Sequence, residues 1–192
     1  MTVFGIDPSL TATGLSDGTD HALAFAPLTQ DGEERALSTR RRTWALARTI
    51  ADWCNARGAQ ADDTFIYIEA PMLYSAAGAG HLYELGWMMS RLYDQLYADG
   101  WLNIIEVDTA KVRKLIGLPG NAKKTLIPLA LYKKFGVEFF KDPGADKAFA
   151  YLLHRYGLAH QAGEIEHVAA PARGQGKRAR GSVRKSAAGR AG

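Results

Sequence analysis

The chain has 192 residues, of which 47% are hydrophobic, and carries a formal net charge of +4. That much apolar sequence suffices for one sizeable core, and the single cysteine, Cys54, excludes an internal disulfide and a multi-cysteine zinc site. No charged and apolar leader follows Met1, and no apolar run approaches the roughly 18 to 20 residues of a membrane span, so we expect a soluble cytoplasmic protein with no membrane partner.

The first predicted strand, Val3 to Ile6, is an apolar run that ends at Asp7. Strands over 12–16 and 21–28 follow, and the turn at 18–20 joins them in an antiparallel hairpin. Taken alone, Asp7 is best interpreted as a turn residue whose side chain bonds the backbone. The alternative is an acidic ligand held at a strand end.

A long helix is predicted over 33–58, with an apolar stripe facing the core. The stripe consists of Leu37, Trp44, Ala47, Ala51 and Cys54. Arg40, Arg41 and Arg42 are consecutive, so they cannot all face the core. A solvated helix face is the first interpretation of these arginines, and contact with phosphates is the second.

The next strand, Phe65 to Ile68, ends at Glu69, which repeats the arrangement at Asp7. A helix over 75–100 follows, with apolar residues at three-and-four spacing. We interpret them as its core-facing side, with a dimer interface as the alternative. They are Leu82, Leu85, Met89, Leu92 and Leu96.

The remaining predicted elements are a strand over 101–107, helices over 109–117 and 121–135, and a final helix over 141–157. The early strands form a meander, and the later ones are reached through helices, which implies parallel crossovers. The order predicts an α/β domain with a mixed five-stranded sheet and helices on both faces.

The end of the chain is basic. From Pro171 onward it holds seven of the 24 Lys and Arg residues and no acid, so residues 1–170 carry 17 basic against 20 acidic residues, a net charge of −3. We therefore divide the chain into a folded domain, 1–168, and a disordered basic tail, 169–192. The tail is suited to binding nucleic acid through Lys177, Arg178 and Arg180, and a solubilising role is the alternative.

Carboxylates follow two strands of the predicted sheet. If the strands that end at Asp7 and Glu69 are parallel neighbours, the two carboxylates converge, and a cation between them would relieve their repulsion. Oxygen ligands suit Mg²⁺ or Mn²⁺. The final helix offers two more acids. Asp142, before Pro143, is a helix cap or a ligand, and Asp146 lies on an apolar helix face where a metal would offset its burial.

Four motifs resemble the RuvC family of Holliday junction resolvases, in the order in which that family has them. They are GIDPSLTATG, IYIEAP, VRKLIGLPGNAKK and DPGADKAFAYLL, and the match extends from residue 3 to about 157. The resemblance implies a ribonuclease H-like fold. It also implies a homodimer that cuts four-way DNA junctions symmetrically with divalent metal ions.

By this resemblance, Asp7, Glu69 and Asp146 are the catalytic metal ligands. The family's further ligand would fall on Pro143, which cannot bind metal, so Asp142 is the substitute. The family's catalytic lysine matches Lys124; the alternative for Lys123 and Lys124 is a solvated helix start.

Three further positions are assigned to DNA. Arg113 matches a second basic position of the family, and Lys123 lies beside the catalytic lysine. By the same resemblance, the family's aromatic or apolar probe would fall on Met72, Leu73 or Tyr74. Of these, Tyr74 would stack on an unpaired base at the crossover, and a surface tyrosine is the alternative.

The resulting hypothesis is a hydrolase with two metal ions about 4 Å apart that clamp the scissile phosphate and leave 5′-phosphates at paired nicks. The length and compact tail would suit a bacteriophage enzyme acting in the host cytoplasm. One rival is a nuclease of the same fold for flaps, forks or RNA–DNA hybrids, and another is a junction-binding protein without catalysis. A third is an actin- or sugar-kinase-like nucleotide-binding protein, against which stands Ser9 where that phosphate loop needs glycine.

Overall fold

The computed structural model describes residues 1–25, 35–57, 63–70, 79–139 and 141–166. Five strands form one sheet in the order β3-β2-β1-β4-β5. They are β1 (Thr2–Asp7), β2 (Ala12–Ser16), β3 (His21–Phe25), β4 (Thr64–Glu69) and β5 (Ile104–Val107). The pairs β1–β2 and β2–β3 are antiparallel, and β1–β4 and β4–β5 are parallel, so the predicted mixed sheet is confirmed.

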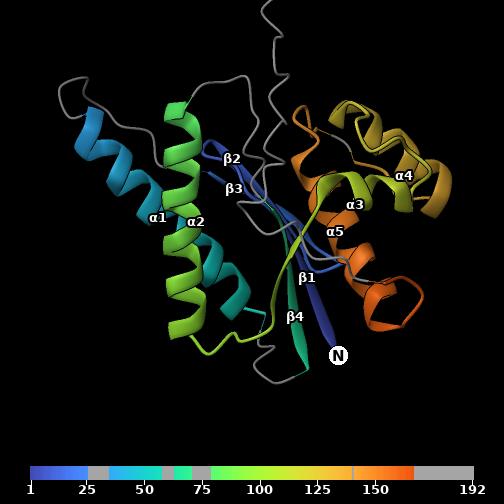
Figure 1. The fold of residues 1–192 in the computed structure, drawn as a ribbon, viewed down its shortest axis with the longest axis horizontal. Helices are drawn as coiled ribbons and strands as arrows, with labels where there is room; N and C mark the ends of the chain where they lie inside the picture. Colours follow the sequence, from blue (N-terminus) through green and yellow to red (C-terminus); the bar gives the residue numbers. More distant parts are fainter. Residues whose placement is uncertain (26–34, 58–62, 71–78, 140, 167–192) are drawn as a thin grey trace, which may run out of the picture.

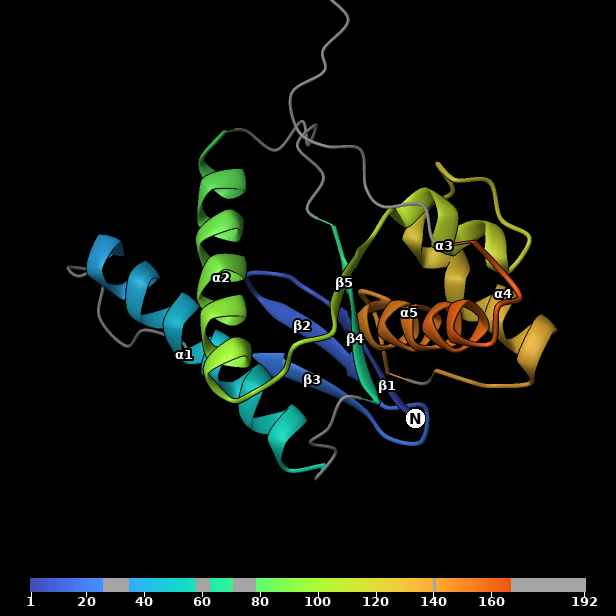
Figure 2. The same ribbon diagram turned by 60° about the horizontal axis from the view of Figure 1, so that its bottom comes forward.

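Helices cover both faces of this sheet. The helices α1 (Arg35–Asn55) and α2 (Ala79–Ala98) lie on one face, and α5 (Asp146–Gln161) lies on the other together with α3 (Thr109–Leu115) and α4 (Ile127–Phe135) (Figure 1). A short 3-10 helix, η2 (Lys124–Leu126), leads into α4. Figure 2 shows α5 packed along the sheet on the side away from α1 and α2.

Two apolar clusters form the core, one on each face. Side chains of a strand point alternately to opposite faces. In β1, Phe4 and Ile6 join the cluster beneath α1 and α2, whereas Val3 joins the cluster beneath α5. In β4, Ile66 and Ile68 join the first cluster and Tyr67 joins the second. Asp7 and Glu69, one step further along, therefore belong to the α5 face.

In helix α1, one part of the predicted apolar stripe is wrong. Ala47, Ala51 and Cys54 are buried, but Trp44 is 53% exposed and its ring lies beneath the guanidinium of Arg48. The core positions that the prediction omitted are Leu46 and Ile50. The side chain of Leu37 lies outside the described residues.

Helix α2 confirms the core interpretation of its stripe. Met89, Leu92 and Leu96 are buried in the cluster shared with α1, and Leu85 packs against that cluster. The side chain of Leu82 lies outside the described residues. In the part of the chain that the structure describes, no helix has both the length and the apolar composition needed to cross a membrane.

The last helix begins later than predicted. The sequence indicates a start near Lys141, with Asp142 as the cap and Pro143 in the first turn, but α5 begins at Asp146. Ala145 directly before it has φ 56°, in the left-handed region, which separates the turn from the helix. The other differences are of a few residues at element ends: the helix predicted from 121 starts as η2 at Lys124, and β5 starts at Ile104 rather than at 101.

Candidate active site

Two acids meet at one edge of the sheet because β1 and β4 are parallel neighbours. Ile6 of β1 pairs with Ile68 of β4, so the residues that follow them, Asp7 and Glu69, lie side by side at the carboxyl ends of the strands. Asp7 is almost completely buried, with 1% of its surface exposed. Burial raises the pKa of the Asp7 carboxyl well above its ordinary value, and the negative charge of Glu69 raises it further.

The third acid comes from the first turn of α5. Helix α5 approaches β2 so closely that a Cβ atom on Gly14 would lie 2.0 Å from the backbone oxygen of Asp146. Gly14 is also the residue that pairs with Asp7 across the β1–β2 ladder. The absence of a side chain at Gly14 therefore lets the start of α5, and with it Asp146, come up to the edge where Asp7 lies.

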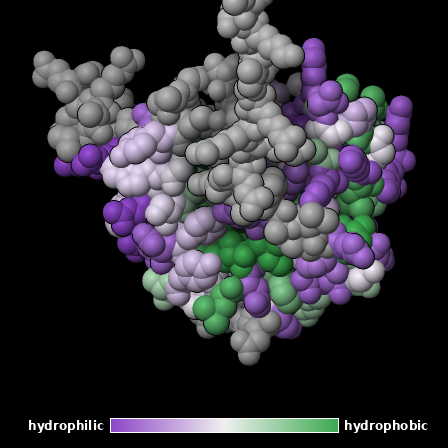
Figure 3. Space-filling model, viewed as in Figure 1, coloured by the Kyte–Doolittle hydropathy of each residue, from purple (hydrophilic) through white to green (hydrophobic). Residues whose placement is uncertain are grey.

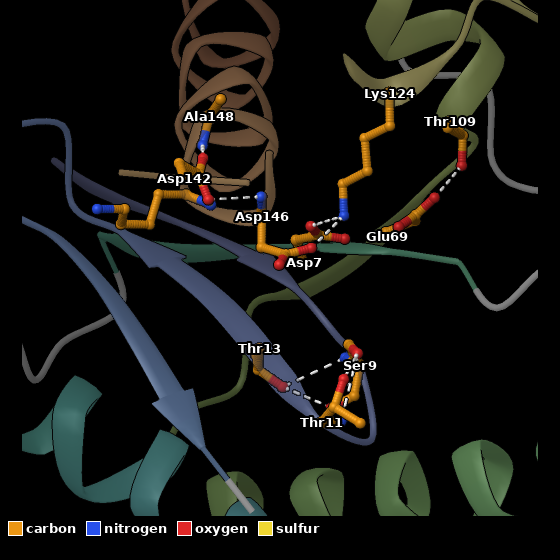
Figure 4. Close-up of polar contacts among 11 residues, drawn as sticks. Asp7, Ser9, Thr11, Thr13, Glu69, Thr109, Lys124, Asp142, Asp146 and Ala148 are labelled. Atoms are coloured by element: carbon orange, nitrogen blue, oxygen red, sulfur yellow. Dashed lines mark hydrogen bonds and ion pairs between the residues drawn. The ribbon is translucent and has the colours of Figure 1, made fainter. Parts of the chain in front are cut away.

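Lys124 joins two of these acids. Its Nζ lies 2.5 Å from Oδ2 of Asp7 and 2.6 Å from Oδ1 of Asp146 (Figure 4). The Lys124 ammonium lowers the pKa of Asp7, against the effects of burial and of Glu69. In turn, the charge of Asp7 and the hydrogen bonds to both carboxylates outweigh the effect of burial and raise the pKa of Lys124. The predicted catalytic lysine and two predicted ligands thus form one ion-paired group.

Glu69 is held by a residue that the sequence did not single out. Thr109, the first residue of α3, donates a hydrogen bond from Oγ1 to Oε1 of Glu69 (Figure 4). The sequence offered one signal for Thr109: it follows closely after β5, the strand that pairs with β4, and so comes near the end of the strand that carries Glu69.

Asp142 caps the helix that carries Asp146. Its Oδ1 accepts hydrogen bonds from the backbone N–H groups of Asp146, at 3.0 Å, and Lys147, at 3.3 Å. Its Oδ2 accepts from the N–H of Ala148 at 2.9 Å (Figure 4). Both oxygens are engaged with the first turn of α5. The geometry therefore supports the capping alternative, and metal ligation by Asp142 stays a prediction.

The acids form a donor set of oxygens only, which is what Mg²⁺ and Mn²⁺ prefer. Among the side chains that the structure describes, no three acidic, histidine or cysteine residues are arranged to hold one ion as they stand. Lys124 occupies the space between two of the acids, since its ammonium pairs with both Asp7 and Asp146. The residues fit a hard divalent cation in chemistry. Binding of one cation by all three carboxylates would require Lys124 to give up its contacts with Asp7 and Asp146.

Two solved structures share this arrangement of elements. One, described as the structure of Thermus thermophilus RuvC, has a TM-score of 0.57 and 17% sequence identity, and the match covers 85% of this chain and 97% of that chain. The other, T. thermophilus RuvC in complex with a Holliday junction substrate, has a TM-score of 0.58 and 17% identity, with 84% and 96% covered. This chain has a RuvC-like fold. The predicted ribonuclease H-like class is thereby confirmed. No protein-family model and no curated protein matches the sequence.

Within this RuvC-like fold, the predicted DNA-binding residues are spread over both faces of the sheet. Lys123 is exposed beside Lys124. Arg113 is turned inward: its Nη1 donates to the Gly120 carbonyl at 2.8 Å, and its guanidinium lies over the Phe149 ring. Arg40, Arg41 and Arg42 belong to α1, which covers the face of the sheet opposite to α5 (Figure 1). Arg40 and Arg41 are exposed and Arg42 is partly buried.

Four of the predicted DNA-binding residues belong to segments that the structure does not describe. Tyr74 lies outside the described residues, as do Lys177, Arg178 and Arg180 of the predicted tail. Their roles stay predictions, and so does the boundary near residue 168.

Charge is divided unevenly along the chain. Residues 1–108 contain no lysine and hold seven arginines against 15 acids, a net charge of −8. Residues 109–147, which we call the basic segment, hold nine basic residues against three acids, a net charge of +6. The basic segment contains α3, η2 and α4, and it supplies Lys124 to the site. On this side of the molecule, hydrophilic side chains alternate with apolar ones (Figure 3).

Proposed function

We propose that this protein is a metal-dependent endodeoxyribonuclease that resolves four-way DNA junctions by paired nicks leaving 5′-phosphates. The observation that carries the proposal is the convergence of Asp7, Glu69, Asp146 and Lys124 at one edge of the sheet. These groups come from β1, β4, α5 and η2, which are far apart in the sequence. An ion-paired group of Lys124 with Asp7 and Asp146 that served structure alone would not require a third acid, Glu69, beside the buried Asp7.

In this proposal, Asp7, Glu69 and Asp146 hold Mg²⁺ or Mn²⁺. When bound, the cations, two per site, supply Lewis-acid stabilisation of charge on the scissile phosphate and lower the pKa of the attacking water. Lys124, released from its contacts with the acids, stabilises negative charge that develops on the phosphate. Asp142 acts through α5, because its carboxylate accepts hydrogen bonds from the backbone of the first turn, in which Asp146 lies.

Branched DNA is the proposed substrate on two grounds. The basic segment next to the site provides a surface of positive charge that suits a phosphate backbone. One of the solved structures with this fold was determined with a Holliday junction substrate. Symmetric resolution needs two sites, so we propose that the protein acts as a homodimer.

The test is to cleave a synthetic four-way junction with the wild-type protein and with Asp7→Asn, in Mg²⁺ and in EDTA. The variant keeps the size of the side chain but removes an anionic ligand. We expect wild-type cleavage only with metal, and no detectable cleavage by the variant, with unchanged junction binding in Ca²⁺.

Parallel reactions on flaps, forks and RNA–DNA hybrids identify the preferred substrate. A variant that cuts as fast as wild type would remove Asp7 from the metal site. Binding without metal-dependent cutting by the wild type would favour a non-catalytic junction-binding protein.

A further inference from the structure

Thr109 is a buried hydroxyl placed against a predicted metal ligand. Only 2% of its surface is exposed. Its Oγ1 donates to Oε1 of Glu69, and hydrogen bonds to carboxylates are stronger than those between neutral groups. Because the Thr109 hydroxyl is engaged with Glu69, its role in the reaction would be exerted through Glu69.

The backbone around Thr109 is fixed from both sides. The Asp108 carboxylate caps α3 by accepting from the N–H of Ala110 at 2.7 Å. The Asp108 carbonyl accepts from the N–H groups of Lys111 and Val112, and Val112 is fully buried in the core. Thr109 is therefore presented from a helix start that has little freedom to move.

The backbone of Glu69 is fixed as well. Glu69 pairs with Val107 in the β4–β5 ladder, and the N–H of Ala70 donates to the Val107 carbonyl at 2.9 Å. The glutamate side chain beyond this backbone still has three rotatable bonds, so the ladder alone does not orient its carboxylate. Thr109 supplies the missing restraint, since its hydrogen bond engages one carboxylate oxygen of Glu69 (Figure 4).

We propose that Thr109 is a positioning residue for Glu69: its hydroxyl holds Oε1 so that the remaining oxygen faces Asp7 and the cation. The inference rests on the proposed function, because it assigns Thr109 to the same metal site. The geometry explains why the two neighbouring acids can share a cation without Glu69 turning away from Asp7, whose charge repels it. Partners that orient metal ligands typically change metal affinity or activity by 10 to 100-fold when removed.

The experiment compares Thr109→Val, which keeps the shape and removes the hydroxyl, with Thr109→Ser, which keeps the hydroxyl. Mn²⁺ affinity of the full chain is measured by electron paramagnetic resonance of free Mn²⁺, without DNA. Junction cleavage is measured over a range of Mn²⁺ and DNA concentrations. We expect Thr109→Val to weaken Mn²⁺ binding about tenfold or more and to lower kcat with KM for DNA unchanged. Thr109→Ser should restore both to near wild type.

The matched control is Thr43→Val on α1. Thr43 is also buried, at 5% exposure, but its hydroxyl donates within its own helix to the Arg40 carbonyl. Thr43→Val should leave Mn²⁺ affinity unchanged. Should Thr109→Val fail to fold, Thr109→Ala provides the same comparison with a smaller side chain.

Wild-type Mn²⁺ affinity in Thr109→Val overturns the inference, as does a Thr109→Ser protein that binds Mn²⁺ as weakly as Thr109→Val. A wild-type protein that binds Mn²⁺ but cuts no branched DNA overturns the proposed function, while the affinities still decide the role of Thr109. A wild-type protein that binds no Mn²⁺ overturns both.

Discussion

Asp7 is a carboxylate that has almost no contact with water, and its neighbours have opposite effects on its pKa. Burial and the neighbouring Glu69 favour the protonated form, whereas Lys124 favours the ionised form. Isolated buried charges are costly, so the Lys124 ammonium is what allows Asp7 and Asp146 to carry charge together. In this arrangement, the Lys124 ammonium offsets part of the negative charge that a divalent cation would offset.

Because Lys124 pairs with Asp7 and Asp146, it should compete with a metal ion for these two carboxylates. Lys124→Met removes the ammonium and leaves an apolar side chain of similar length. We expect a lower thermal midpoint in EDTA, because the buried acids lose their counter-ion, together with severalfold tighter Mn²⁺ binding, because no ion pair has to be broken. Both are measured by thermal unfolding across a Mn²⁺ titration.

The control for this change is the next residue. Lys123 is exposed and has no ion pair with Asp7 or Asp146 among the residues that the structure describes, so Lys123→Met should match wild type in both measurements. Unchanged or weaker Mn²⁺ binding by Lys124→Met would contradict the competition between the ammonium and the metal.

At the scale of elements, the site depends on how closely α5 lies on the sheet. A Cβ on Gly5 would lie 2.0 Å from the Ala150 carbonyl oxygen, and one on Gly14 would lie 2.0 Å from that of Asp146. Both obstacles are backbone atoms, which cannot rotate away as a side chain would. The two glycines thus set the distance between the strands that carry or flank Asp7 and the helix that carries Asp146.

Gly14→Ala should therefore damage the site more than its single methyl group suggests. The methyl forces the first turn of α5 outward, and we expect a loss of about 1–3 kcal/mol in the free energy of unfolding. Junction cleavage should fall strongly even where the protein is still folded, because Asp146 moves away from Asp7. Denaturant titration and a cleavage assay measure the two effects.

Gly86 of α2 is a control, because the space around it is open. A Cβ there meets nothing within 4 Å, so Gly86→Ala should keep wild-type cleavage and gain roughly 0.5–1 kcal/mol of stability from the better helix former. A Gly14→Ala protein that cleaves at the wild-type rate would show that the close approach of α5 is not needed.

The elements themselves were predictable to a large extent, because their signals are local. The apolar runs that end at Asp7 and Glu69 predicted two strands, and parallel pairing predicted that the acids meet. The start of α5 was not predictable in this way. Asp142 and Pro143 have the sequence of a cap and a first turn, but Ala145 adopts φ 56° and moves the helix start to Asp146. Asp142 still caps it, from four residues away.

The finer chemistry of the site could not be predicted from spacing. The contact of Lys124 with Asp7 joins residues 117 apart in the sequence, and that of Thr109 with Glu69 joins residues 40 apart. Neither pair has a local pattern. Trp44 illustrates the same limit on the surface, since its helical position lies at the margin of the apolar stripe and packing alone decided its exposure.

At the scale of the whole molecule, the division of charge along the chain gives the site an acidic side and a basic side. Residues 1–108, with their net negative charge, form the sheet and the layer of α1 and α2. The basic segment forms the layer of α3 and α4 on the other face (Figure 1). The three acids lie where these parts meet, with Lys124 reaching in from the basic side. A polyanion drawn to the basic segment would thus be brought up to the carboxylates, which by themselves would repel it.

Salt dependence of junction binding tests this arrangement. Removing one side chain that neutralises a DNA phosphate should reduce the slope of log K against log salt concentration by about 0.9. We expect Lys114→Ala with Lys133→Ala, both exposed in the basic segment, to reduce the slope by about 1 to 2 in Ca²⁺, where no cutting occurs. The same change of charge on α1 and α2, Arg48→Ala with Arg91→Ala, should leave the slope at its wild-type value, since these arginines pair with Asp52 and Asp94. Equal slopes for the two double variants would mean that DNA does not distinguish the basic segment from the rest of the surface.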